Sequence, residues 1–215
     1  MSTQQHDQFY YKGIWFDLTA TNGKLADIYG ILGYEPLRKH TGCHRGYTAV
    51  YEILDNSLAL GYLETSNVVG RKGISPETEL TVFEPTPING VKPILTFDEL
   101  IFERNPNSLY RDVKYPDTAL KLSFTGAVVI GDNQVWRTWG DFQHPWHYET
   151  VFELHFDNGA FIREIDLSNL SLHIRENDKE EMLIESKRKK DSQFAEIFLK
   201  KMSERYYSWF KSMYR

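Results

Sequence analysis

Cysteine is almost absent from this chain of 215 residues, in which Cys43 stands alone. A single cysteine cannot form an intramolecular disulfide, and this excludes a disulfide-stapled fold. No run of about 18 apolar residues occurs, so we expect no membrane-spanning segment. The polar start, MSTQQHDQ, lacks the apolar core of a signal peptide, and we therefore expect a cytoplasmic protein.

Motifs of common catalytic chemistry are also missing. The sequence has no G-x-x-x-x-G-K-S/T phosphate loop, no G-x-G-x-x-G, no G-x-S-x-G nucleophile elbow and no H-E-x-x-H zinc motif. We therefore name no catalytic residue and expect no cofactor and no metal. A binding protein is favoured over an enzyme, with catalysis left as the alternative.

Positive charge is scarce over most of the chain. Residues 1–186 contain 16 Lys and Arg against 27 Asp and Glu, whereas residues 187–215 contain nine against three. An acidic body repels nucleic acid and complements a basic protein. We therefore expect a protein partner and no nucleic-acid binding, and we interpret the basic tail as docked or solvated.

Aromatic residues, in contrast, are plentiful at 14% of the chain, and their side chains suit the pleated surface of a sheet. Two stretches predict β-hairpins, one from Tyr47 to Glu64 and one from Tyr148 to Ile165, each with Asp-Asn at its turn. In the second hairpin, the period of two places Glu153 and His155 opposite the apolar face. This alternation predicts that both side chains face solvent.

The two hairpins resemble one another. Tyr47 aligns with Tyr148, and Tyr51 aligns with Phe152, on the face that we expect to be buried. A duplicated β unit of about 100 residues explains the likeness, with a period too long for solenoid repeats. Chance similarity between two generic hairpins is the alternative.

Glycine and proline divide the remaining chain into further elements. Asn22-Gly23 is a strong turn signal, because both central residues of a type I′ turn need positive φ. We expect it to lead into a strand at Lys24–Tyr29, with a short helix at Leu25–Leu32 as the weaker alternative. A strand is predicted at Phe9–Leu18, with Gly13 as a bulge inside it. A second strand is predicted at Leu120–Ile130 and ends in a turn at Gly131-Asp132-Asn133. We also expect a loop at Asn105–Pro116 and a strand at Leu167–Ile174.

The end of the chain has a different character. From Asp178 onward there is no glycine or proline, and apolar residues recur at steps of three and four. This spacing predicts a C-terminal amphipathic helix that covers one face or one open end of the sheet.

The predicted fold is mainly β (α+β): an antiparallel, barrel-like structure of about ten strands with a C-terminal helix. We divide the chain into two related β halves at 1–105 and 106–176, and a helix at 177–215. A single domain is the alternative.

Two segments carry a resemblance to known proteins: FTGAVVIGDNQVWRTWGDFQHPWHYETVFELHFDNGAFIREIDLS, and GYTAVYEILDNSLAL before it. They resemble a group of uncharacterised bacterial β-rich proteins with no established activity. Those chains similarly carry an aromatic-Thr-Gly strand and then a strand ending in a short acidic or Asn-Gly turn. Some of these proteins are similar to immunity proteins encoded beside secreted toxins. The resemblance implies a protein partner and assigns no functional residue.

A histidine-bearing loop precedes each hairpin, and the first holds His40, Cys43 and His44. Imidazole and thiolate are zinc ligands, but this spacing fits no common zinc motif, and a solvated loop is favoured. In the second loop, Gly140–His147, proline and tryptophan separate two histidines and predict a stiff turn packed on the sheet. If the halves are related by a pseudo-twofold axis, the two loops approach one another.

Two readings of function follow. The preferred one is a non-catalytic binding protein of the immunity type that recognises a protein partner. The alternative is a small-molecule carrier or enzyme, whose small apolar ligand lies near the loop Gly140–His147, at a mouth lined by Trp139, His144, Trp146 and His147. Glu52 and Glu153 form a possible acid–base pair, although their strand positions favour solvent exposure.

Overall fold

The computed structural model describes residues 5–37, 43–69, 81–96, 111–135, 145–173 and 175–176. The chain divides into two compact units, Met1–Ser171 and Leu172–Arg215. The described residues of the second unit are helical, and the helix predicted at 177–215 lies outside the described residues. No described helix is long and apolar enough to cross a membrane.

The first unit holds the β structure. Within the described residues, ten strands form one mixed, mostly antiparallel sheet in the order β12-β11-β10-β2-β1-β3-β4-β8-β7, with β9 also paired to β4. This confirms the predicted mainly β, barrel-like fold. The strands are β1 (Gln8–Tyr11), β2 (Ile14–Thr21), β3 (Tyr47–Leu54), β4 (Ser57–Ser66), β7 (Ile94–Thr96), β8 (Asp112–Tyr115), β9 (Leu120–Lys121), β10 (Gly126–Gln134), β11 (Tyr148–Asp157) and β12 (Ala160–Asp166); β5 (Val68–Val69) and β6 (Thr81–Val82) form a separate two-stranded sheet.

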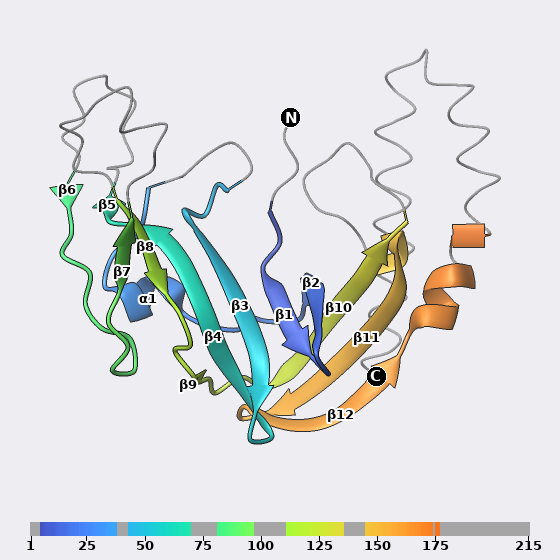
Figure 1. Cartoon of the computed structure of the whole chain (residues 1–215). Coiled ribbons are helices and arrows are strands. Elements are labelled where there is room, and N and C mark those ends of the chain that lie inside the picture. Colours follow the sequence, from blue (N-terminus) through green and yellow to red (C-terminus); the bar gives the residue numbers. More distant parts are fainter. Residues whose placement is uncertain are drawn as a thin grey trace, which may run out of the picture. The chain divides into compact units, whose positions relative to one another are not determined.

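The two predicted hairpins form, as β3–β4 and β11–β12, and their turns close the sheet into a ring. Ala160 of β12 pairs with Ser57 of β4, and the two turns lie side by side at the bottom of Figure 1. The Leu58 amide donates to the Gly159 carbonyl at 2.7 Å. In the opposite direction, the Phe161 amide donates to the Asn56 carbonyl at 2.9 Å. The ring is therefore held at this seam by the tips of the two hairpins.

The strands that precede the two hairpins are arranged differently. β1 lies parallel to β3, whereas β10 lies antiparallel to β11. Strands of both predicted halves share one sheet, because β2 pairs with β10. The internal duplication stays a prediction.

The prediction of one long strand at Phe9–Leu18 is wrong. Lys12 and Gly13 have φ values of 51° and 81°, and they form the turn between β1 and β2. Positive φ at two successive residues is what a two-residue hairpin turn needs, so Gly13 marks a turn and not a bulge. At the tip of this hairpin, Lys12 forms an ion pair with Glu164 of β12 at 2.7 Å.

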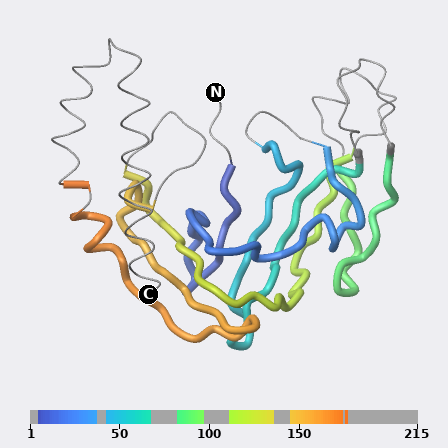
Figure 2. Tube along the Cα trace, turned by 180° about the vertical axis from the view of Figure 1, so that it is seen from behind, coloured from blue at the N-terminus to red at the C-terminus, as the bar shows by residue number. Residues whose placement is uncertain are grey.

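The strand predicted at Lys24–Tyr29 is also wrong, and the helical alternative is correct. Asn22 and Gly23 make no type I′ turn, because neither has the positive φ that such a turn needs. The Oδ1 of Asn22 instead accepts the Ala127 amide of β10 at 2.9 Å. The chain then crosses in front of β3 and β4 in the view of Figure 2 and enters α1 (Ile28–Leu32). Gly33, with φ of 77°, ends this helix in the left-handed conformation.

The strand predicted at Leu120–Ile130 is in fact β9, a break and β10, and β10 continues through the turn predicted at 131–133. Gly131 has another role. A Cβ added there would lie 2.5 Å from Cγ of Tyr148, so glycine lets that ring pack against the backbone. The Tyr148 hydroxyl then donates to Asp17 of β2 at 2.7 Å, and this contact ties β11 to β2 across β10.

Two other predictions are corrected. The loop predicted at Asn105–Pro116 contains β8, whose alternating Val113 and Tyr115 are buried against β4. The strand predicted at Leu167–Ile174 contains a helical turn, because the Ser171 amide donates to the Leu167 carbonyl.

The core fills the inside of the ring. Tyr51 of β3, Phe16 of β2 and Leu154 of β11 are buried there, with the chain between β2 and α1 covering them through Leu25. Phe152 contacts Phe16 edge-on at a centroid distance of 5.8 Å. Such aromatic contacts add to the burial of apolar area that drives folding.

Candidate functional site

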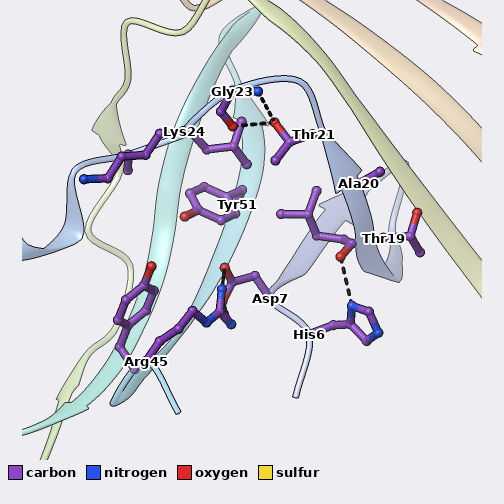
Figure 3. A pocket seen from close by; sticks show the side chains of 13 residues that line it. His6, Asp7, Thr19, Ala20, Thr21, Gly23, Lys24, Arg45 and Tyr51 are labelled. Atoms are coloured by element: carbon purple, nitrogen blue, oxygen red, sulfur yellow. Dashed lines mark hydrogen bonds and ion pairs between the residues drawn. The ribbon is translucent and has the colours of Figure 1, made fainter. Parts of the chain in front are cut away.

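A hollow of about 270 Å³ opens between β2, β3 and the two segments that flank them. Its walls come from the residues before β1, from the end of β2, from the chain leading to α1, and from β3 (Figure 3). The lining residues are His6, Asp7, Leu18, Thr19, Ala20, Thr21, Gly23, Lys24, Leu25, Ala26, Arg45, Tyr47 and Tyr51.

An ion pair between Asp7 and Arg45 forms one wall. Arg45 Nη1 donates to Asp7 Oδ2 at 2.7 Å, and Nη2 donates to Oδ1 at 3.0 Å. The Ala49 amide also donates to Oδ1, at 2.9 Å. Both carboxylate oxygens are therefore already satisfied, in the bidentate geometry that arginine favours.

Backbone contacts hold both partners of this pair in place. The Leu18 amide donates to the Asp7 carbonyl at 2.8 Å, which anchors the residue immediately before β1. Arg45 lies in a tight turn that ends at Gly46, where φ is 75° and an added Cβ would lie 2.6 Å from the Pro36 carbonyl oxygen. Only glycine fits at that position, so Gly46 helps to present Arg45 to the hollow.

Burial sets the charge balance of the pair. Asp7 is 6% exposed, and burial raises the pKa of its carboxyl above the usual value, against the opposing effect of Arg45. Burial lowers the pKa of the Arg45 guanidinium, but the charge of Asp7 outweighs it and the net shift is upward. Arg45 lies nearer to solvent, with 36% of its side chain exposed. Asp7 is thus the partner that depends on the pair to stay charged.

Two tyrosines from β3 face the same hollow. The guanidinium of Arg45 lies over the Tyr47 ring at 5.0 Å from its centroid. Burial and the nearby Asp7 raise the pKa of Tyr47 to about 12, and the same causes raise the pKa of Tyr51 well above its usual value. Both phenols therefore keep their protons near neutral pH and can donate hydrogen bonds.

The Tyr51 hydroxyl has no hydrogen-bond partner among the described residues. Tyr51 is 3% exposed, and in Figure 3 its ring projects between Lys24 and the Asp7–Arg45 pair. Among the described residues, Glu153 Oε2 is the buried side-chain oxygen that lacks a partner, so the unpaired Tyr51 hydroxyl is open to the space of the hollow. There it can donate a hydrogen bond to a molecule from outside the chain.

Two of the four ligand-binding residues predicted from sequence belong to the part of the chain that the structure describes. Trp139 and His144 are outside the described residues. Trp146 and His147 lie in a short 3₁₀ helix, η1 (Pro145–His147), with their rings 5.9 Å apart. His147 is 2% exposed and lines no part of the hollow.

The histidine and cysteine side chains considered as zinc ligands from sequence, and not favoured, are only partly described. His40 is outside the described residues, Cys43 is buried with its Sγ donating to the Tyr47 carbonyl at 3.3 Å, and His44 is exposed. Among the described residues, no three His, Cys, Asp or Glu side chains are grouped to hold a metal ion.

The predicted exposure of Glu153 is wrong. Glu153 is 2% exposed, and its Oε1 lies 2.5 Å from Nε2 of His155, which is itself half-buried. Its Oε2 has no hydrogen-bond partner in the described part of the chain. β11 is buried on both faces, with Val151 and Leu154 on opposite sides, so alternation alone could not identify a solvent face.

Glu52 and Glu153 are not brought together. They lie on β3 and β11, and three strands separate these in the sheet. The acid–base pair considered from sequence has no counterpart in this arrangement.

Sequence reasoning missed Asp7 and Arg45. Asp7 falls in a polar start that resembles a disordered terminus, and Arg45 falls in a loop whose histidines draw attention first. The pairing of β1 with β3 brings these two segments together. Comparisons of the chain with protein families, curated proteins and solved structures found no match.

Proposed function

We propose that this is a binding protein whose hollow between β2 and β3 holds a small molecule. The observation that carries the proposal is the Tyr51 hydroxyl, which faces the hollow and makes no hydrogen bond to a described residue. A ligand in the hollow can accept a hydrogen bond from this phenol, and such a placed polar contact fixes the orientation of a bound molecule.

The size and lining of the hollow suit a small ligand. Its volume of about 270 Å³ lies just below the range of about 300–1,000 Å³ that is common for drug-sized ligands. Apolar Leu18, Ala20 and Leu25 provide contact area, and the tyrosines and Arg45 provide orientation. A mostly apolar hollow with a few placed polar groups is the usual design of a ligand site.

Filling the hollow tests this proposal. Ala20→Leu adds three carbon atoms to the wall of the hollow. The affinity for small aromatic fragments, measured by saturation-transfer NMR on the full chain, is expected to fall by about tenfold or more. A tenfold loss corresponds to about 1.4 kcal/mol in binding free energy. Thr48→Leu is the control, because it enlarges a half-buried side chain on β3 outside the hollow. Equal fragment binding by all three proteins, or none by the unmodified chain, contradicts the proposal.

A second function, recognition of a basic protein, is supported by an exposed aromatic pair. Tyr10 of β1 and Trp15 of β2 are cross-strand neighbours, 39% and 55% exposed, with ring centroids 5.0 Å apart. Tyrosine and tryptophan are the residues most enriched in interface hot spots. Glu52 of β3 is the cross-strand neighbour of Tyr10, and it adds to the acidic character of residues 1–186. An immunity-type role belongs to this second function.

Trp15→Ser tests the protein-recognition reading. It removes the larger ring of the pair, so a bound protein is expected to dissociate at least about 30-fold faster, since hot-spot truncations cost about 2 kcal/mol or more. Ile94→Ser is the control, because Ile94 is 52% exposed on β7 at the far end of the sheet. The measurement is surface plasmon resonance against a basic protein that copurifies with the full chain. Unchanged kinetics in Trp15→Ser, or an equal loss in Ile94→Ser, contradicts a binding role for this pair.

A further inference from the structure

We infer that the ligand of the hollow is a small carboxylic acid in its anionic form, with an apolar body; this rests on the proposed function. The inference follows from a comparison of the hydrogen-bond donors and acceptors that line the hollow. The side chains of Tyr51, Arg45 and Lys24 keep donors to spare, whereas both oxygens of the one carboxylate in the lining are already paired, so an anionic acceptor suits the hollow.

The single carboxylate of the lining has no free oxygen to offer. Asp7 Oδ2 accepts from Arg45, and Oδ1 accepts from both Arg45 and the Ala49 amide. The Thr19 hydroxyl donates to the Val129 carbonyl at 3.0 Å and the Thr21 hydroxyl donates to the Gly23 carbonyl at 2.7 Å, so neither hydroxyl is among the spare donors. A cationic ligand would therefore enter without an unused carboxylate oxygen to meet it.

Donors remain on three sides of the hollow. The Tyr51 hydroxyl is unpaired among the described residues. The Arg45 guanidinium has five N–H groups, and its hydrogen bonds go to Asp7 and the Gln5 carbonyl through three contacts. Lys24 pairs with Asp27 at 2.5 Å, with both side chains 65% exposed. Such an exposed pair contributes little, so the Lys24 ammonium can turn to a ligand at small cost.

A carboxylate meets these donors better than a neutral acceptor does. Hydrogen bonds to charged groups are worth about twice as much as neutral ones, and a phenol with a raised pKa stays protonated to donate. Tyr51 and Tyr47 remain in that state across the neutral range, because burial raises the pKa of both. Leu18, Ala20 and Leu25 then contact the apolar body of the acid.

Benzoate, benzamide and benzamidinium distinguish the charge of the ligand, because the three probes share one ring and differ in the head group. On the full chain, calorimetry is expected to give benzoate an affinity about tenfold above that of benzamide, with no measurable binding of benzamidinium, because charge-assisted hydrogen bonds exceed neutral ones by about 1.4 kcal/mol. Raising the salt concentration is expected to weaken benzoate binding, because the charges of Arg45 and Lys24 that meet it are 36% and 65% exposed.

Removing one hydroxyl supplies the matched control. Tyr51→Phe is expected to weaken benzoate about tenfold and to leave the free energy of unfolding unchanged, since the hydroxyl has no partner in the described residues. Tyr34→Phe is expected to lower the free energy of unfolding and to leave benzoate binding unchanged. The Tyr34 hydroxyl donates to the Ser66 carbonyl at 2.9 Å, and Tyr34 lies outside the hollow.

The outcomes separate the two proposals. Tighter binding of benzamide or benzamidinium than of benzoate, with loss in Ala20→Leu, overturns the carboxylate and leaves the small-molecule function standing. Equal benzoate binding by Tyr51→Phe and the unmodified chain also overturns it. Failure of all three probes, together with failure of fragments of other chemistry, overturns both proposals.

Discussion

Replacing Arg45 with methionine is expected to lower the free energy of unfolding by about 3 kcal/mol at pH 7, near the lower end of values for breaking a buried ion pair. The substitution leaves the Asp7 carboxylate, 6% exposed, without its bidentate partner. Methionine keeps much of the packing of the arginine stem, so the lower free energy of unfolding measures the removal of the positive charge. Because Arg45 is partly exposed, we expect the loss of unfolding free energy to stay below the upper end of the range for buried ion pairs.

The loss should shrink as the pH falls. Burial raises the pKa of Asp7, and in Arg45→Met the opposing charge is gone, so the pKa of this carboxyl rises further. A group whose pKa is raised on folding binds its proton more readily in the folded state. Stability is then gained as the pH falls through the raised pKa toward the unfolded value of about 4. The variant should therefore approach the unmodified chain in acid.

Urea unfolding at a series of pH values measures this effect. Asp7→Asn is the comparison and is expected to cost less than Arg45→Met, since the orphaned Arg45 can reach solvent. Lys121→Met, on an exposed residue of β9, controls for the loss of a surface charge and should stay within about 0.5 kcal/mol. A loss in Arg45→Met that stays below about 1 kcal/mol, or grows in acid, is incompatible with a buried, pair-dependent Asp7, because about 1 kcal/mol is the upper end of the usual range for exposed pairs.

Gly159→Ala is expected to lower the free energy of unfolding by about 3–4 kcal/mol, because it combines backbone strain with a steric clash. Gly159 has φ of 85°, and an added Cβ would overlap the carbonyl oxygen of Leu122. The Gly159 backbone also bonds Leu58 of β4 and Phe124, so relief of the clash would open the seam of the ring.

Gly13→Ala is the matched control for this substitution. Gly13 has nearly the same φ, 81°, but an added Cβ would meet no atom within 4 Å. Its expected cost is therefore the strain alone, about 1 kcal/mol. Chemical denaturation of both variants separates the two contributions. If both variants lose the same free energy of unfolding, the backbone around Gly159 relieves the clash at no cost. That result would contradict tight packing of the two hairpin tips at the seam.

Local patterns in the sequence were enough for the two hairpins. The alternation in β3 and β11 and the Asp-Asn turns lie within 20 residues, and the structure has both elements where they were predicted. Asn22 and Gly131 were misread for one reason. Each is a turn signal in isolation, and its role depends on a strand distant in sequence, such as the packing of Tyr148 on Gly131.

The candidate site depends entirely on such long-range placement. Asp7 and Arg45 meet because β1 lies parallel to β3, and no local period predicts a parallel neighbour. Tyr51 was correctly assigned to the buried face of its hairpin. That the same face borders a hollow follows from the chain that crosses between β2 and α1, which carries Leu25 and Lys24 to it.

A crystal structure of the full chain soaked in benzoate tests the central claim most directly. The expected result is density in the hollow between β2 and β3, with the carboxylate accepting hydrogen bonds from the Tyr51 hydroxyl and Arg45. The contradicting result is a hollow that holds only water at a saturating benzoate concentration, or benzoate bound instead beside Trp146 and His147.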